Sequence, residues 1–195
     1  ASRQSVLLGG EVVARNMSEL KLSRQAVVEQ FRDLLGLPVI VVEPPPEFHL
    51  DLGFTFLDDH TVAVADPAEG LRLVADLPEM APLVKATLDK RLVEKYERAA
   101  LQLVALGLRV VRLPNLCGVG LTTPYLTYNN VLLEQYGSVK RAYLPVYDVP
   151  ALDECARGIY RGHGFQVVDM PSARLSTKLW GAIRCATGEL RVTDT

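Results

Sequence analysis

FHLDLGFTFLDDHTVAVAD, residues 48–66, is the stretch that decides how this chain folds. Polar and apolar residues alternate from His49 to Leu57, and a β-branched run returns from Thr61 to Ala65, so each half is typical of a strand. Asp58-Asp59-His60, between the two halves, has the composition of a tight turn. The stretch therefore predicts a β-hairpin.

The order hairpin, helix, strand occurs twice in full. The first copy continues from this hairpin with a helix and a strand, over Pro82–Leu106 and Leu108–Leu113, with Gly107 between them. The second copy turns at Gly137-Ser138 and comprises Tyr128–Glu134, Arg141–Leu144, Pro150–Gly162 and Phe165–Asp169. Copies that recur every roughly 70–80 residues indicate an internal repeat. A mixed-sheet α/β domain without a repeat would also alternate strands and helices.

A shorter strand-helix-strand copy opens the chain. It is predicted over Val6–Ala14, Arg24–Leu35 and Pro38–Val42, with Ser23 as the helix N-cap and Gly36 as its end. Pro44-Pro45-Pro46 then forms a stiff connector that has to leave any sheet interior. Two closing strands are expected around Ile183 and over Leu190–Val192.

Composition bounds the class of protein. A chain of 195 residues with 49% hydrophobic and 23% charged residues fits one globular domain over residues 1–195. The net charge of -2 argues against broad nucleic-acid binding, which needs basic surface. Three scattered cysteines favour a reducing compartment, so we expect a cytoplasmic protein. The sequence contains no apolar run of roughly 18 residues and no metal-ligand spacing, so we expect neither a membrane span nor a metal or organic cofactor.

Cys185 is a candidate nucleophile, because His49-Leu50-Asp51 lies far upstream. A thiol, a histidine and a carboxylate that are distant in sequence can meet in a fold, and together they make a nucleophilic site. Two plainer interpretations stay open. A cysteine in an apolar stretch is often a small core residue. His49 and Asp51, two residues apart on a strand, would share one face and could form a surface ion pair.

Three segments in order resemble the guanidine-modifying superfamily, which comprises arginine and agmatine deiminases, dimethylarginine hydrolases and amidinotransferases. Residues 48–55, FHLDLGFT, resemble the family's His-x-Asp strand. Residues 127–132, TYNNVL, with Pro145 and Asp148 further on, are similar to its Tyr-x-Asn strand and the following Pro segment. Residues 181–187, GAIRCAT, resemble the terminal Gly-Asn-Ile-His-Cys-x-Thr segment that carries the nucleophile.

The chain also departs from the family pattern. Arg184 stands where the family usually has His, and Trp180-Gly181-Ala182 stands for Gly-Gly-Asn. The family's Glu-Gly-Gly segment would precede Val6, where Ser2-Arg3-Gln4-Ser5 stands, and an acidic residue of an earlier module is not found. The family fold is an α/β propeller of five strand-strand-helix-strand modules. This chain has room for about three of them, so the resemblance implies a pseudo-symmetric partial propeller, the C-terminal part of a longer fold.

The resemblance also implies site roles. Cys185 would be the nucleophile, His49 the general acid and base, and Asp51 a carboxylate that binds the guanidinium group. Asn130 could line the site or only satisfy backbone groups at the start of a strand. Guanidinium chemistry suits these residue types, because carboxylates orient a planar cation and a thiolate attacks its carbon.

The function implied is a thiol-dependent hydrolase, that is, a deiminase, or an amidinotransferase that acts on arginine, agmatine or methylated arginine. A non-catalytic binding module of the same fold is the alternative, since fold alone does not give activity. An incomplete copy that is inactive alone is a third reading. The expected partners are a small guanidinium substrate and a second chain, or a further copy of this one, that completes the propeller; neither nucleic acid nor membrane is expected.

Overall fold

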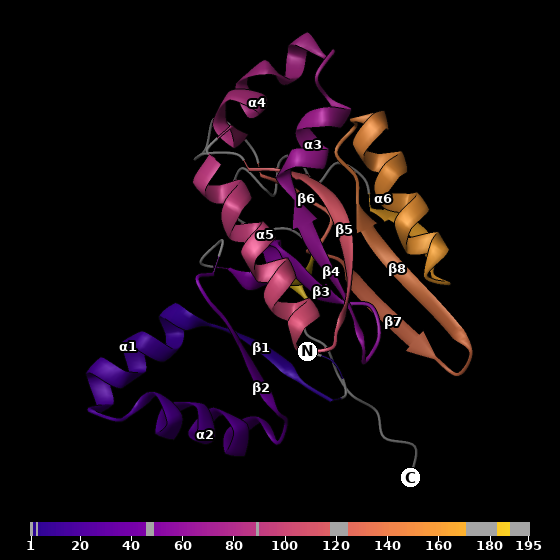
Figure 1. The fold of residues 1–195 in the computed structure, drawn as a ribbon. Helices are drawn as coiled ribbons and strands as arrows, with labels where there is room; N and C mark the ends of the chain where they lie inside the picture. Colours follow the sequence, from indigo (N-terminus) through magenta and orange to yellow (C-terminus); the bar gives the residue numbers. More distant parts are fainter. Residues whose placement is uncertain are drawn as a thin grey trace.

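The computed structural model describes residues 2, 4–45, 49–88, 90–117, 125–170 and 183–187, and its strands form three separate sheets (Figure 1). The sheets have the orders β1-β2, β3-β4-β5-β6 and β7-β8-β9. This arrangement excludes a single continuous parallel sheet across the described residues. It is a mixed α/β fold, as the sequence predicts.

The middle sheet contains the hairpin of residues 48–66. β3 (Phe54–Phe56) pairs antiparallel with β4 (Thr61–Asp66), and β4 pairs parallel with β5 (Arg109–Leu116) after a helical crossover. The short strand β6 (Leu126–Thr127) extends the sheet on the far side of β5. β4 is buried over nearly its whole length, because it lies in the sheet interior and helices cover it.

The third sheet repeats that pairing pattern. β7 (Leu132–Tyr136) and β8 (Val139–Pro145) form an antiparallel hairpin, which turns through Gly137 at φ +56°. Helix α6 (Pro150–Gly162) then leads to β9 (Gln166–Met170), which pairs parallel with β8. The twice-repeated order of hairpin, helix and strand is therefore present in the structure, with the same strand directions in both copies.

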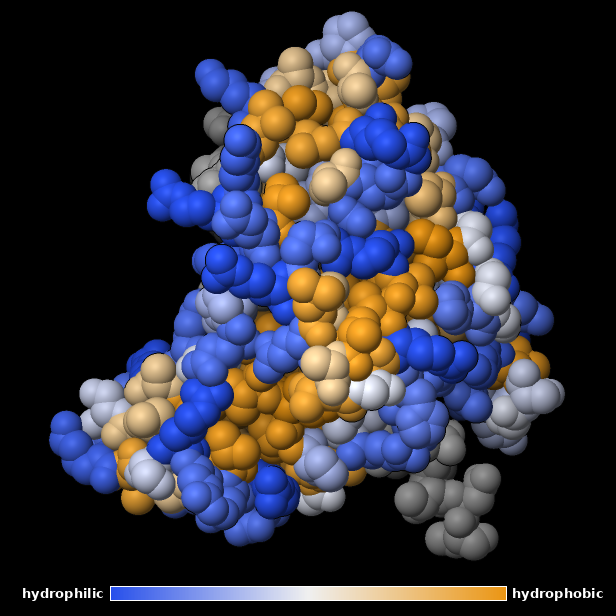
Figure 2. Space-filling model, in the orientation of Figure 1, coloured by the Kyte–Doolittle hydropathy of each residue, from blue (hydrophilic) through white to orange (hydrophobic). Residues whose placement is uncertain are grey.

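The first sheet is smaller and less covered. β1 (Val6–Gly9) and β2 (Val39–Val42) pair in parallel across helices α1 (Gly10–Leu20) and α2 (Arg24–Leu35). In both strands only the last residue is buried, and Figure 2 shows hydrophobic side chains gathered over this part of the molecule. Helix α2 has the predicted ends: the Ser23 side chain accepts the Ala26 amide, and Gly36 closes the helix at φ +65°.

Three predicted elements are wrong in detail, and helix α3 (Pro67–Leu73) was missed. The strand expected over Val6–Ala14 ends at Gly9, because Gly9-Gly10 starts helix α1 instead of breaking a strand. The helix expected over Pro82–Leu106 is two helices, α4 (Ala81–Thr87) and α5 (Lys90–Ala105). Helix α3 (Pro67–Leu73) was not predicted, although Asp66 caps it and Pro67 begins it. Cys117 follows β5 directly, because that strand runs three residues beyond its predicted end into the expected loop.

Two strands predicted in the segments that carry Asp51 and Cys185 also differ from the prediction. Leu50–Leu52 is a 3-10 turn, η1, and not part of a strand. Ile183 lies in a turn before a second 3-10 turn, η3 (Arg184–Ala186), so no strand forms there. The strand expected over Leu190–Val192 and the residues Trp180, Gly181 and Ala182 lie outside the described residues.

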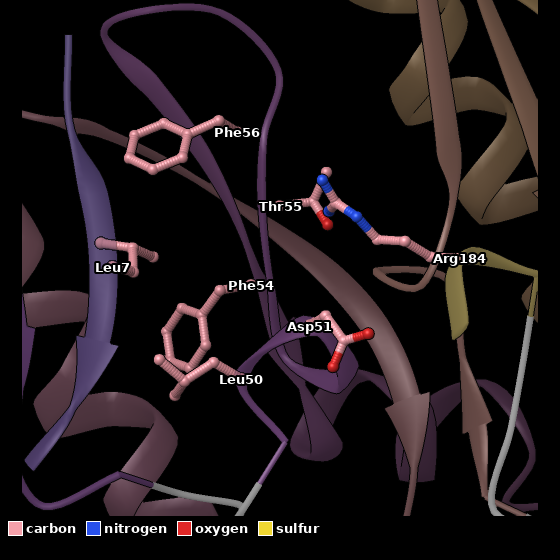
Figure 3. Close-up of a pocket in the computed structure, with 7 residues that line it drawn as sticks. All are labelled: Leu7, Leu50, Asp51, Phe54, Thr55, Phe56 and Arg184. Atoms are coloured by element: carbon pink, nitrogen blue, oxygen red, sulfur yellow. The ribbon is translucent and has the colours of Figure 1, made fainter. Parts of the chain in front are cut away.

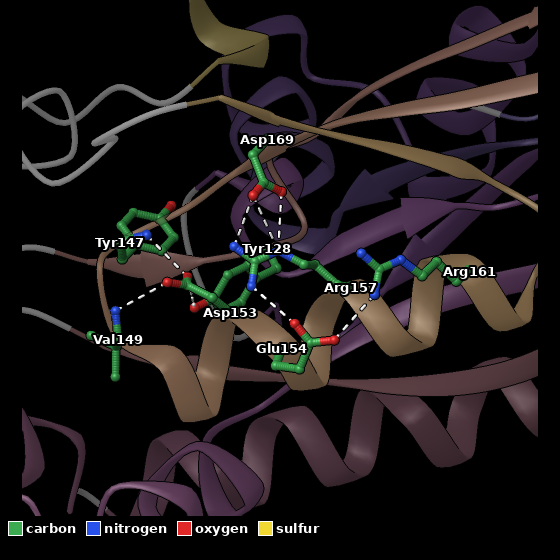
Figure 4. A network of polar contacts seen from close by, with 8 residues as sticks. All are labelled: Tyr128, Tyr147, Val149, Asp153, Glu154, Arg157, Arg161 and Asp169. Atoms are coloured by element: carbon green, nitrogen blue, oxygen red, sulfur yellow. Dashed lines mark hydrogen bonds and ion pairs between the residues drawn. The ribbon is translucent and has the colours of Figure 1, made fainter.

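A buried carboxylate joins the second repeat to its helix. Asp153, in the first turn of α6, accepts a hydrogen bond from the Tyr128 hydroxyl at 2.7 Å (Figure 4). The same carboxylate accepts the backbone amides of Tyr147 and Val149, each at 3.0 Å. These donors compensate for the burial of the charge, and the helix N-terminus favours it. Because Tyr128 directly precedes Asn129-Asn130, this network fixes the backbone that leads into the site.

Arg157 lies one turn after Asp153 in α6 and contacts β9. Its guanidinium pairs with Asp169 of β9 at 2.9 Å and with Glu154 at 3.1 Å (Figure 4). Hydrogen bonding to Asp169 raises the pKa of Arg157 above its ordinary value. The helix is thus tied to the strand that it precedes.

Close packing of α3 on β5 gives a stability prediction. A Cβ atom at Gly70 would lie 2.0 Å from the backbone oxygen of Asn115, whereas a Cβ at Gly158 in α6 meets nothing within 4 Å. We expect Gly70→Ala to destabilise the protein by about 2 kcal/mol or more through overpacking. The matched control Gly158→Ala should stabilise it by about 0.5–1 kcal/mol. Urea denaturation followed by circular dichroism measures both; equal midpoints for the two variants would contradict this packing.

Candidate functional site

The site forms where the first repeat meets the start of the second. Thr127 donates its hydroxyl to the Leu52 carbonyl at 2.5 Å, which ties β6 to the η1 turn. Thr55 of β3 donates its hydroxyl to the Asn129 carbonyl, and the Asn129 amide donates to the Ala63 carbonyl at 2.9 Å. These buried bonds place the His49–Leu52 segment beside the Asn129-Asn130 turn, although about 75 residues separate the two segments.

Asn130 is the centre of the polar contacts. This side chain is fully buried, and its Nδ2 donates to Asp51 Oδ2 at 2.6 Å and to Cys185 Sγ at 3.4 Å. The Cys185 thiol in turn lies 3.7 Å from Asp51 Oδ2, to which it can donate. One amide therefore holds a carboxylate and a thiol together.

His49 completes the group of four predicted site residues. Its Nδ1 lies 3.8 Å from Asp51 Oδ1, and about half of its side chain is exposed, compared with 30% of that of Asp51. The shared strand face predicted for these two residues is wrong, because the η1 turn brings them together instead. Cys185 is exposed and not a core residue. The structure thus brings Cys185, His49, Asp51 and Asn130 together, while their roles remain predictions.

The same asparagine fixes the turn that carries the thiol. The Arg184 backbone amide donates to Asn130 Oδ1 at 2.8 Å, and the Thr187 hydroxyl donates to the Arg184 carbonyl at 3.2 Å. Burial raises the pKa of Tyr147, and the neighbouring charges of Asp153 and Cys185 raise it further. Burial likewise raises the pKa of Tyr160, while the Arg184 charge opposes that shift. Both tyrosine side chains are fully buried.

Two adjoining cavities share Asp51, Leu50 and Leu7 in their walls. The first, of about 170 Å³, extends over β3 and is also lined by Thr55 and Arg184. Figure 3 shows the Arg184 side chain reaching toward Thr55, with the Asp51 carboxylate below it. Neither Cys185 nor Asn130 lines either cavity. The Cys185 thiol instead contacts Asp51, which lines both cavities.

The second cavity, of about 220 Å³, brings in a residue that sequence reasoning missed. Glu11, in the first turn of α1, lines it together with His49 and Asp51. The prediction of a strand through residue 14 hid this acidic residue, since its position depends on the helix that begins at Gly10. The Gly-Gly pair before an acidic residue was the available signal.

The described residues contain no group of three or more His, Cys, Asp or Glu side chains placed to hold a metal ion. Within the same residues, no helix has the length and apolar character that a membrane crossing requires. The other two cysteines lie outside the site: Cys117 is buried and Cys155 is partly buried. Burial raises the pKa of the Cys155 thiol.

Comparison with known proteins identifies the fold through solved structures, whereas comparison of sequences assigns no family. No protein-family model matches the chain, and no curated protein sequence matches it. Solved structures do match. A protein from Porphyromonas gingivalis with a provisional description as an arginine deiminase superposes with a TM-score of 0.66 at 18% identity, over 93% of this chain and 51% of that one.

Two agmatine deiminases match similarly. A C. jejuni enzyme with substrate bound gives a TM-score of 0.65 at 14% identity, over 94% of this chain and 51% of its own. An Enterococcus faecalis enzyme gives a TM-score of 0.59 at 14% identity, and the match covers 93% of this chain and 52% of that one. The chain thus has the fold of part of an arginine or agmatine deiminase and spans about half the length of these structures.

The contact between Asp51 and Cys185 gives a reactivity prediction. The Asp51 carboxylate lies 3.7 Å from the sulfur, and its negative charge repels the negative charge that a sulfur carries when it attacks an alkylating reagent. We expect Asp51→Asn to speed alkylation of Cys185 by iodoacetamide at pH 7 roughly fivefold, the effect of about 1 kcal/mol of charge repulsion near solvent. Peptide mapping by mass spectrometry gives the rate. Asp33→Asn on the exposed face of α2 is the control. An unchanged rate in Asp51→Asn would mean that the two groups do not interact in solution.

Proposed function

We propose that this chain carries the thiol site of a guanidine-modifying enzyme, which hydrolyses or transfers the amidino group of arginine, agmatine or methylated arginine. The observation that supports it most is the placement of Cys185 within 3.7 Å of Asp51, across 134 residues of sequence, with His49 at the same carboxylate. The fold shared with deiminase structures supports the same proposal.

Substrate capture is the task of the acidic side chains. A guanidinium group is planar and positively charged, and a carboxylate can accept two of its N–H groups in parallel. Asp51 is oriented for this role by the Asn130 amide, which donates to only one of its oxygens. Glu11 adds a second negative charge to the cavity that Asp51 and His49 line. Such a cation would bind the carboxylate that the Cys185 thiol contacts at 3.7 Å.

In the first chemical step the Cys185 thiolate forms a C–S bond to the guanidinium carbon. The C–N bond then breaks, and the nitrogen departs as ammonia or an amine with a proton from His49. The enzyme is left as a covalent thiouronium. In the second step His49 takes a proton from water, whose oxygen attacks the same carbon as the C–S bond breaks. The products are a ureido compound, ammonium and the regenerated thiolate.

Asn130 contributes by position. Its Nδ2 donor is oriented toward the sulfur and can stabilise the thiolate before attack. Its Oδ1 holds the Arg184 amide, which fixes the residue next to the nucleophile. A fixed nucleophile and a fixed carboxylate lower the entropic cost of reaching the reactive geometry.

We also propose that the modules are arranged as part of a propeller. Three separate sheets, two of which repeat an identical strand pairing, support modules placed around a pseudo-rotation axis. A second chain that completes such a ring remains a proposal. Light scattering after size-exclusion chromatography would detect it.

The proposed activity predicts a cysteine dependence. The 195-residue chain is incubated with arginine, agmatine and methylated arginine, and ureido product and ammonia are measured. We expect turnover of at least one compound, a loss of at least about 1000-fold in Cys185→Ser because the nucleophile is gone, and nearly unchanged turnover in Cys155→Ser. After a quenched reaction, Cys185 should carry the mass of the substrate less the ammonia or amine that has left.

The outcomes also separate the alternatives. Turnover that survives in Cys185→Ser would exclude the thiol mechanism. Tight binding of a guanidinium compound without turnover or adduct would identify the chain as a binding module, and the enzyme proposal would be abandoned.

A further inference from the structure

Two buried tyrosine hydroxyls hold the backbone that leads into Asn130. Tyr147 donates its hydroxyl to the Thr127 carbonyl at 2.7 Å, and the Thr127 amide donates back to that hydroxyl oxygen at 3.3 Å. Tyr160, near the end of α6, donates to the Tyr128 carbonyl at 2.8 Å. Burial raises the pKa of both hydroxyls above the ordinary tyrosine value, so each keeps its proton and can act as a donor.

The middle sheet does not hold this segment by itself. β6 ends at Thr127 and lies at the edge of its sheet, so Tyr128 and Asn129 follow outside the strand pairing. Thr127, Tyr128 and Asn129 are all fully buried, and a buried carbonyl without a donor is costly. The two tyrosines serve the first two carbonyls, and the Thr55 hydroxyl serves the third, that of Asn129.

Packing alone does not require the two tyrosine hydroxyls. The Tyr147 ring packs edge-to-face on the Tyr128 ring with centroids 5.3 Å apart (Figure 4), and the Tyr160 ring packs in the same way on Phe165 at 5.9 Å. A phenylalanine ring could make the same contacts and would lose only the bond to the backbone. Each hydroxyl is therefore directed at the segment that ends in Asn130.

We propose that Tyr147 and Tyr160 are positioning residues for the proposed thiol site. Their hydroxyls fix the backbone before Asn130 and so direct its amide at the carboxylate and the thiol together. This inference rests on the proposed function for the role of the thiol. Neither tyrosine lines either cavity, so both act through the asparagine. The asparagine amide lies 2.6 Å from Asp51 Oδ2 and 3.4 Å from Cys185 Sγ, and a rotation of the preceding backbone would move both contacts.

The rate at which iodoacetamide alkylates Cys185 at neutral pH tests the inference without turnover. Asn130→Ala should slow alkylation by about tenfold or more, because the amide that stabilises negative charge on the sulfur is lost. Tyr147→Phe and Tyr160→Phe should each slow it by about fivefold, since the amide is present but displaced. Peptide mapping by mass spectrometry gives each rate.

A double-mutant cycle separates positioning from a general structural role. In the Asn130→Ala background, Tyr160→Phe should change the alkylation rate by less than about twofold, because the group that its hydroxyl positions is absent. The same result is expected for Tyr147→Phe. A loss of hydroxyls that only loosened the fold would slow alkylation in both backgrounds alike.

Two control variants account for hydroxyl loss and for lowered stability. Tyr143→Phe removes a hydroxyl that donates to Glu134 at 2.9 Å within the third sheet. Val27→Ala truncates a buried side chain of α2 and should lower the urea midpoint at least as much as the tyrosine variants. Both controls should be alkylated at Cys185 within about twofold of the unmodified rate, since neither touches the segment before Asn130.

Each outcome decides the inference. Unchanged or faster alkylation in both tyrosine variants, equal slowing in the Asn130→Ala background, or equal slowing in Val27→Ala would overturn it. Its failure is distinct from failure of the proposed function. Turnover that requires Cys185, together with normal alkylation in the tyrosine variants, would refute only the positioning role. Slowing that depends on Asn130 in a chain without turnover would refute only the chemistry.

Discussion

The side chain of Asn130 is the interaction on which the site depends. A single buried amide donates to Asp51 and to Cys185 and accepts the Arg184 backbone, so it joins three segments that lie far apart in sequence. Its own position follows from the two repeats. Tyr128 is held to Asp153 of α6, and the following turn is held to β3 and β4 by Thr55 and Asn129. Without the module packing, the carboxylate and the thiol would have no common neighbour.

The position of the candidate site follows from the repeat of hairpin, helix and strand. Each full copy contains a hairpin, a crossover and a parallel strand. One hydrophobic cluster contains buried residues of both copies, and the other joins the first copy to Val42 of β2. The η1 turn of one copy and the turn before β7 of the next lie at their junction. A junction between rigid units allows functional side chains to be fixed while the space above them stays accessible, as a binding site requires.

The sequence predicts the parts of this fold that have strong local signals. Both hairpins, α2 with its Ser23 and Gly36 ends, and α6 at its observed bounds follow from periodicity and capping. Errors arose where local patterns compete. The run from Val6 to Ala14 reads as a strand, yet its glycine pair allows a helix to begin at Gly10 and to present Glu11 to the cavity. Likewise, residues 49–52 alternate like a strand, but hydrogen bonds from later segments hold them in a turn. The four candidate site residues were predicted by motif. That Asp51 and Cys185 share the Asn130 amide could not be read from spacing, since it depends on tertiary contacts.

The central claim is that Asp51 presents a planar cation to Cys185. The most direct test compares alkylation of Cys185 by 2-chloroacetamidine and by neutral chloroacetamide, each rate divided by that of a small free thiol. The account predicts that the amidinium reagent is favoured by at least about tenfold, since it is attracted to a carboxylate 3.7 Å from the sulfur, and that Asp51→Asn removes this preference. Equal normalised rates for the two reagents in the unmodified chain would contradict it.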